Sequence, residues 1–154
     1  VRLMEAVPNV NSQGEQDLAQ TRQWLKRVLD EEVAARLEPE LQRARRSLPP
    51  VTSLQLVGTG GTAGILGCME AKLEVFDRDR LESVSLNIDR LQQTLTLLWS
   101  LSLAERKNIV GLPANRADVI LTGAAIYEAI MTRFGFQELH ISSRGLRFGA
   151  ALSS

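Results

Sequence analysis

The sequence has little of what several common kinds of active site require. Cys68 is the only cysteine and His140 the only histidine among 154 residues. An internal disulfide and a cysteine-based zinc site are therefore excluded, and the chain lacks residues needed for catalysis of the Cys–His or Ser–His–Asp kind. A lone cysteine fits a reducing compartment, and we expect the chain to be cytoplasmic.

The sequence also lacks an excess of charge of one sign and any long apolar run. Eighteen basic and eighteen acidic side chains give a net charge of zero, so no overall field draws the chain to nucleic acid or to an anionic membrane. No apolar run approaches the roughly 18 residues of a membrane span. We therefore expect neither nucleic acid nor membrane as a partner, and any anion site must be local. The cluster "RARR" at residues 43–46 has no aromatic residues among its arginines, which favours a solvated helix face.

What is present is an ordinary globular composition, with 44% hydrophobic and 23% charged residues. A length of 154 residues suits one core, so we expect residues 1–154 to form a single domain. Because the sequence starts at Val1 rather than Met, we also expect it to be a fragment of a longer protein.

Helical patterns outnumber strand patterns along the chain. Apolar residues recur at helical spacing from about residue 15 to residue 37, and Pro39 is expected to interrupt this helix. Ser85 is expected to cap a later helix, and Ser102 with Glu105 forms a capping-box pattern. A further helix is expected to run to Phe134 and end at a glycine.

Two segments are predicted as strands. Residues 54–57 lie between a Pro-Pro pair and a glycine cluster, and residues 138–142 alternate after the last helix. Strands alternating with helices indicate an α/β fold with parallel strands. Two strands make a small sheet, so we expect further strands, of which residues 1–7 are a remnant, to be missing on the N-terminal side. An unpaired edge on residues 54–57 would invite pairing with a second chain, so we expect a homodimer or poor stability.

The glycine cluster "VGTGGTAG" stands between the first predicted strand and a helix. In an open α/β sheet ligands bind beyond the carboxyl ends of the strands, where this turn lies. Glycines let the backbone approach an anion closely, and the helix that follows offers unpaired N–H groups and a positive dipole end. We therefore predict phosphate binding by Gly58, Thr59, Gly60, Gly61 and Thr62. The alternative is a tight turn that only packs against a neighbouring element.

Three kinds of phosphate loop compete for this pattern. A Walker loop is excluded because no lysine follows the glycines. A dinucleotide fingerprint fits G-x-G-x-x-A from Gly58 to Ala63, with Asp77 about 20 residues on. However, the residues after Asp77 predict helix rather than the repeated βαβ units of that fold. The third possibility is the phosphate turn of actin-like folds, in which two related halves clamp a phosphorylated ligand.

The chain resembles the exopolyphosphatase and guanosine pentaphosphate phosphohydrolase family, which belongs to the actin-like, hexokinase-like superfamily. The matching segments occur in the family's order: "VRL", "GTGGTAGIL", "FDRDRLESVSLNIDRL", "LSLAERKNIVGLPANRADVILTGAAIYEAIM" and "LHISSRGLRFGAAL". The resemblance covers almost the whole chain. It implies a helix-rich ribonuclease-H-like (actin-like) half-domain with a short, partly parallel sheet, corresponding to the C-terminal part of the second half.

The resemblance also implies a phosphate-contacting role for the glycine turn, and it makes Arg116 in "NRADVI" a candidate ligand contact. Asp118 is expected to cap or orient the helix start. The family's Asp-x-Gly-Gly-Gly-Ser-x-Glu loop and its catalytic glutamate are absent, and Phe148 stands where the family commonly has an acid. We therefore assign no catalytic residue and no metal ligand. Magnesium is expected in the intact family enzyme and not in this fragment.

The function implied is a fragment of a phosphoanhydride hydrolase, inactive alone, that supplies part of a phosphate-binding cleft. Its expected partners are polyphosphate or a phosphorylated guanosine nucleotide, together with the missing N-terminal half of the same protein. A non-catalytic regulatory module that binds a phosphorylated nucleotide is the alternative, and a dinucleotide-binding domain is a weaker one. Whether the parent protein is an enzyme stays open at this point.

Overall fold

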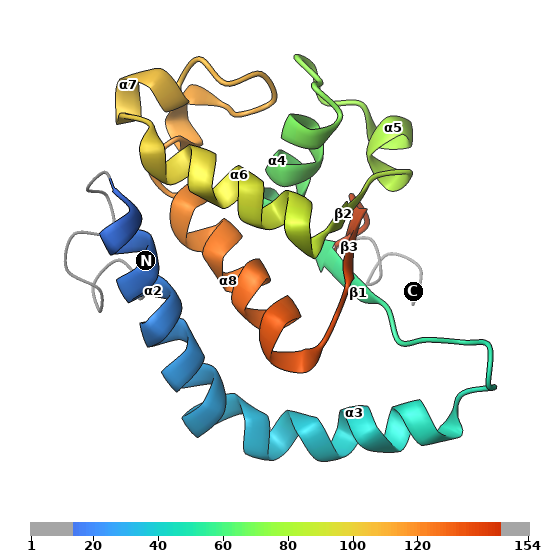
Figure 1. The fold of residues 1–154 in the computed structure, drawn as a ribbon. Helices are drawn as coiled ribbons and strands as arrows, with labels where there is room; N and C mark the ends of the chain where they lie inside the picture. Colours follow the sequence, from blue (N-terminus) through green and yellow to red (C-terminus); the bar gives the residue numbers. More distant parts are fainter. Residues whose placement is uncertain (1–13, 146–154) are drawn as a thin grey trace.

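The computed structural model describes residues 14–145, in which helices surround a small sheet (Figure 1). The elements are α2 (Glu15–Val28), the π-helix η1 (Leu29–Ala34), α3 (Ala35–Ser47), β1 (Leu56–Thr59), α4 (Gly61–Glu70), α5 (Arg78–Glu82), β2 (Ser85–Asn87), α6 (Ile88–Ser100), α7 (Leu103–Arg106), the 3-10 turn η2 (Ala114–Arg116), α8 (Ile120–Phe134) and β3 (Glu138–Ser142). The predicted strand remnant at residues 1–7 and Phe148 lie outside the described residues. No helix of the described part is both long and apolar enough to cross a membrane.

The sheet has the strand order β1-β3-β2, with β1 and β3 parallel. Val57 pairs with His140 and Gly58 with Ile141. The prediction of two adjacent parallel strands is therefore confirmed, although β1 begins two residues later than expected and continues to Thr59, into the glycine cluster. In the described sheet β1 is an edge strand, and Val57 on it is half exposed.

The third strand, β2, was not predicted. It runs antiparallel to β3, with Leu86 opposite Leu139, and both side chains are fully buried. The expectation that Ser85 caps α6 is therefore wrong, because Ser85 lies in β2. Asn87 is the cap, since its Oδ1 accepts a hydrogen bond of 2.8 Å from the backbone N–H of Arg90. Both residue types are good caps, and the pairing of Leu86 with β3 decides between them.

The core lies where α4, α6 and α8 pack on one face of the sheet. Leu139 and Ile141 point into this core from β3, while His140 between them is half buried on the opposite face. In Figure 1, α8 and α6 run side by side through the centre, and α2 packs against both. Helix α8 ends as predicted, because Gly135 adopts the left-handed conformation at its C-cap (φ 73°).

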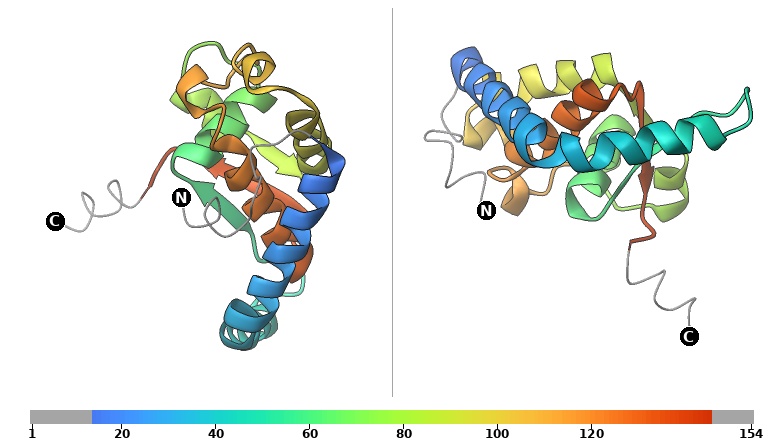
Figure 2. Two further views of the ribbon diagram at one scale, coloured as in Figure 1. Left: turned by 90° about the vertical axis from the view of Figure 1, so that its left-hand side faces the viewer. Right: turned by 90° about the horizontal axis from the view of Figure 1, so that it is seen from below.

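A bend joins α2 to α3, and Figures 1 and 2 show α3 extending along one side of the molecule as an arm. The π-helix η1 forms this bend. The expected interruption at Pro39 is wrong, since α3 passes through it. Arg133 of α8 pairs with Asp30 in η1 and, at 2.6 Å, with Glu38 in α3, and these contacts hold the bend and the start of α3 against α8.

Candidate functional site

A pocket of about 730 Å³ opens at the edge of the sheet where the parallel strands β1 and β3 end. Gly60 and Gly61 follow β1 directly, Ser142 is the last residue of β3, and Ser143 follows it. Because Thr59 and Ser142 are partners in the β1–β3 register, these two strand ends lie next to each other. The remaining lining comes from α4, the segment after it and the long loop before α8: Gly64, Ile65, Cys68, Leu73, Glu74, Phe76, Ile109, Val110, Gly111, Leu112, Pro113, Asn115 and Arg116.

The turn after β1 has the backbone geometry of an anion site. Gly60 is the N-cap of α4 and has a positive φ of 85°, a conformation that side-chain-bearing residues rarely adopt. No side chain caps this helix, so its first N–H groups, on Gly61, Thr62 and Ala63, have no partner within the helix. A Cβ placed on Gly60 or Gly61 would meet nothing within 4 Å. The open space and the positive helix end together fit a phosphate.

The other predicted residues of the turn lie beside the pocket rather than in its lining. Gly58 is buried, and a Cβ there would stand 3.0 Å from Leu139 Cδ1, so a larger residue would fit tightly and displace its neighbours slightly. Thr59 is exposed, and its carbonyl accepts a long hydrogen bond of 3.4 Å from the Tyr127 hydroxyl. The side chain of Thr62 lies directly against Gly123 of α8. Gly60 and Gly61 are thus the part of the predicted set that lines the pocket.

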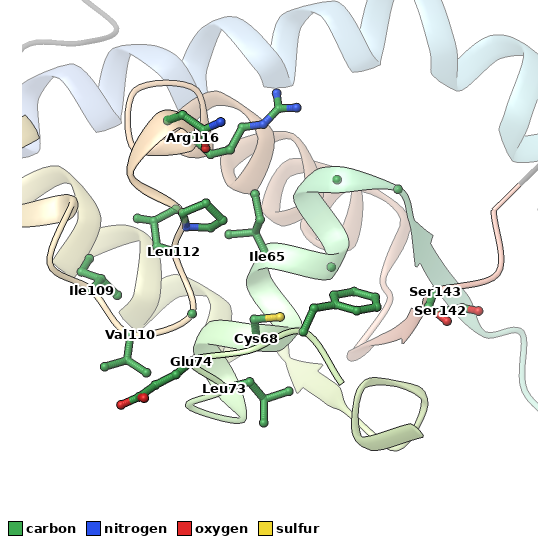
Figure 3. Close-up of a pocket in the computed structure, with 17 residues that line it drawn as sticks. Ile65, Cys68, Leu73, Glu74, Ile109, Val110, Leu112, Arg116, Ser142 and Ser143 are labelled. Atoms are coloured by element: carbon green, nitrogen blue, oxygen red, sulfur yellow. The ribbon is translucent and has the colours of Figure 1, made fainter. Parts of the chain in front are cut away.

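Arg116 lies in η2, is exposed and lines the pocket. Its guanidinium forms no ion pair or hydrogen bond with another residue of the described part of the chain, so its donors are available to a ligand. In Figure 3, Arg116 lies at one end of the pocket and Glu74 near the other, with Ile65 and Cys68 of α4 between them. Asp118, expected to orient the start of α8, accepts a hydrogen bond of 2.9 Å from the backbone N–H of Val119.

One wall of the pocket is a loop that the sequence reasoning missed. Residues 109–113 form this wall, and at its centre Gly111 has a positive φ of 84°. The backbone of Gly111 lies so close to α4 that a Cβ would stand 2.5 Å from the Cys68 carbonyl and 2.6 Å from the Met69 nitrogen. The loop is therefore fastened to the helix that carries the glycine turn. In the sequence this segment shows only a glycine followed by Leu-Pro, a pattern that does not indicate a contact with α4.

Glu82 at the end of α5 was also missed. Its carboxylate accepts hydrogen bonds from the backbone N–H of Ser143 at 2.8 Å, from the Ser143 hydroxyl at 2.5 Å and from the Ser142 hydroxyl at 3.1 Å. The Ser143 hydroxyl bond is the main cause that lowers the pKa of Glu82 below its usual value. These bonds fix the end of β3 at the rim of the pocket. Only the folded chain brings Glu82 and these serines together, since they are about sixty residues apart.

The lining is mostly apolar, and its charged side chains are Glu74 and Arg116. Such a pocket can bind one phosphate group at the glycine turn and place an apolar or aromatic part of the ligand against Ile65 and residues 109–113. Residues 14–145 hold no group of three or more acidic, histidine or cysteine side chains that could bind a metal ion. We therefore derive no step through magnesium, and its presence in the intact family enzyme stays an expectation.

Comparison with known proteins bears on the family and the fold of the chain. A sequence profile of the Ppx/GppA phosphatase family matches residues 9–154. A curated protein of Fusobacterium nucleatum, a bifunctional 3-dehydroquinate synthase/phosphatase, is 27% identical over 100 residues, which cover 65% of this chain and 15% of that protein. The similarity thus spans a small part of this curated relative's length.

Solved structures match almost the whole chain. A structure of the Aquifex aeolicus PPX-GPPA enzyme superposes with a TM-score of 0.78 at 22% identity, covering 100% of this chain and 46% of that one. An exopolyphosphatase from Cytophaga hutchinsonii gives a TM-score of 0.69 at 19% identity, covering 99% and 46%. The chain therefore spans less than half the length of these structures, and its fold is that of one half-domain.

Proposed function

The chain belongs to the Ppx/GppA phosphatase family, and from that membership we propose that it supplies part of the phosphate-binding cleft of a phosphoanhydride hydrolase. The observation that carries the proposal is the pocket at the ends of β1 and β3, where an uncapped helix start meets open space at Gly60 and Gly61. A ligand phosphate would accept hydrogen bonds from the N–H groups of the turn. Arg116 would add a charge-assisted hydrogen bond.

The lining favours a phosphorylated guanosine nucleotide over bare polyphosphate. The apolar wall at residues 109–113 suits a nucleobase, because a base can bury its faces against apolar side chains. The same wall supports the second candidate, a regulatory module that binds the nucleotide without hydrolysing it.

The proposal is tested by titrating the chain, in a calorimeter, with inorganic tripolyphosphate and with guanosine pentaphosphate. Arg116→Gln should weaken both ligands about tenfold or more, since a hydrogen bond to a charged group contributes about 1.5–3 kcal/mol. Arg36→Gln, which removes an exposed arginine of α3, is the matched control and should leave both affinities unchanged. Equal affinities of the two variants would contradict the role of Arg116.

A hydrolysis assay distinguishes the two candidate functions, part of a hydrolase or a regulatory module. We expect this chain alone to release no phosphate from polyphosphate, and a longer chain with the rest of the family's sequence to do so. Phosphate release by this chain above a blank, lost on chelation of magnesium, would contradict the expectation. A longer chain that binds guanosine pentaphosphate and does not hydrolyse it would favour the regulatory module.

A further inference from the structure

Phe76 is an exposed aromatic side chain in the lining of the pocket, and the proposed function does not use it. Its side chain is 59% exposed, although phenylalanine is among the residue types that are most often buried. Val110, which lines the same pocket, is exposed as well. Single exposed apolar residues are common on protein surfaces, but two of them in the lining of one pocket favour a surface that binds an apolar part of a ligand.

Hydrogen bonds fix the chain on both sides of Phe76. Before it, the backbone N–H of Leu73 donates to the Cys68 carbonyl at 2.9 Å, and the Leu73 side chain is buried. After it, the side chain of Asp77 accepts a hydrogen bond of 3.1 Å from a backbone N–H in the first turn of α5 and caps that helix. The residues between Leu73 and Asp77 are therefore a short connection with both ends fixed, so the fold holds Phe76 at the pocket.

The Cys68 carbonyl joins two walls of the pocket to α4. It accepts the hydrogen bond from Leu73, and it also lies 2.5 Å from the place that a Cβ on Gly111 would take. The segment that carries Phe76 and the loop at residues 109–113 are thus both attached near the C-terminal end of α4. The glycine turn forms the N-terminal end of this helix. A helix rises about 1.5 Å per residue, so the turn lies about 12 Å from Cys68, a distance that a nucleoside with a phosphate chain can span.

The two charged side chains of the lining give the pocket a direction. Figure 3 shows Arg116 at one end and Glu74 near the other. Glu74 is exposed and lies two residues before Phe76. A phosphate is attracted to a guanidinium and repelled by a carboxylate. The charges therefore favour a ligand whose phosphate lies towards Arg116 and whose uncharged part lies towards Phe76.

We propose that Phe76 stacks against the base of a nucleotide whose phosphate binds at the glycine turn. The inference rests on the proposed function, which places the base beside residues 109–113, and it adds the residue that distinguishes a nucleotide from bare polyphosphate. Every nucleobase has a flat face that can cover an aromatic ring, and polyphosphate has none. Because stacking tolerates any base, Phe76 selects nucleotides over polyphosphate and does not select guanine over adenine.

The test compares guanosine pentaphosphate with inorganic tripolyphosphate, which has no base, in a calorimeter. Phe76→Leu keeps an apolar side chain and removes the ring, so binding of guanosine pentaphosphate should weaken about fivefold or more. Binding of tripolyphosphate should stay unchanged, and so should the melting temperature, because the side chain is exposed. Leu97→Ala is the matched control, since Leu97 is 51% exposed on α6 and lies outside the pocket lining, and it should change neither affinity.

Phe76→Trp separates stacking from a general effect on the pocket. The larger ring should bind guanosine pentaphosphate at least as tightly as the wild type does. After the emission of the wild-type chain is subtracted, the fluorescence of the new indole should fall as guanosine pentaphosphate saturates the site and stay constant with tripolyphosphate. Leu97→Trp places an indole outside the pocket lining, so its fluorescence should not change with either ligand.

An unchanged affinity of Phe76→Leu for guanosine pentaphosphate, or an equal loss for both ligands, would overturn the inference and leave the proposed function intact. The inference would also be overturned if Phe76→Leu reduced only self-association in sedimentation experiments, because a second copy of the chain would then cover the ring. A wild-type chain that binds neither ligand would overturn both the inference and the proposed function.

Discussion

Alanine substitution in the glycine turn tests whether the turn binds phosphate or serves only as scaffold. Gly60 and Gly61 both line the pocket, yet their backbones differ, since Gly60 has a φ of 85° and Gly61 begins α4. The backbone conformation of Gly60 is one that almost only glycine adopts. Alanine at this position should therefore lower the free energy of unfolding by about 1–3 kcal/mol. For a chain of this size the melting temperature should fall by roughly 2–12 °C.

Gly61→Ala carries no such strain and has open space for its methyl group. Replacing glycine by alanine at a compatible position stabilises by about 0.4–1 kcal/mol, so the melting temperature should stay unchanged or rise by a few degrees. If the N–H groups of the turn cradle a phosphate, the added methyl blocks its approach. Affinity for tripolyphosphate should then fall about tenfold, which corresponds to about 1.4 kcal/mol.

Gly135→Ala is the matched control for backbone strain. Gly135 also has a positive φ, 73°, and open space for a methyl, but it caps the end of α8 away from the pocket lining. This variant should melt at a lower temperature and bind tripolyphosphate like the wild type. Both quantities come from calorimetry on the same samples. An unchanged affinity of Gly61→Ala would refute phosphate binding by the turn and leave it as scaffold.

Three further outcomes are expected. Gly111→Ala combines a positive φ with overlap against the backbone of α4, so thermal unfolding should show a loss of about 2–5 kcal/mol; a melting temperature equal to wild type would contradict this packing. The pKa of Glu82 is lowered in the folded chain by the Ser143 hydroxyl, so its contribution to stability is complete above its ordinary value of 4.5 and is lost as the pH falls through the lowered one. The difference in melting temperature between wild type and Glu82→Gln should therefore shrink from pH 6 towards pH 3, and a constant difference would be inconsistent with these bonds. Because β1 is an uncharged edge strand of the described sheet, the chain should self-associate in sedimentation experiments, and Val57→Lys should reduce this; a stable wild-type monomer would count against the prediction.

The strands and the glycine turn were predictable because their signals are local. An apolar run bounded by Pro-Pro and a glycine cluster indicates a strand followed by a turn, and the structure pairs this strand with Glu138–Ser142. The capping box of Ser102 and Glu105 and the glycine end of α8 were likewise confirmed, since each involves residues within one turn. The half-domain fold was predicted from the resemblance to the family, because no local sequence pattern indicates it.

What escaped prediction depends on contacts between distant segments. Strand β2 is three residues long and is defined by its pairing with β3. Arg106 reads as a surface charge in "AERK", and only the packing of α7 buries it. Glu82 reaches the serines of the pocket rim, and Gly111 reaches α4, through tertiary contacts that have no counterpart in sequence spacing.

The central claim is that the pocket at the ends of β1 and β3 binds the phosphate of the ligand. The most direct measurement is an amide NMR titration of the chain with inorganic tripolyphosphate. We predict that the largest saturable shifts occur at the amides of Gly61, Thr62 and Ala63, with Arg116 shifting in parallel. The claim would be contradicted if no shift saturated at millimolar tripolyphosphate, or if the largest shifts lay in the separate cleft between α2, α6 and α8, which Arg22 and Arg133 line.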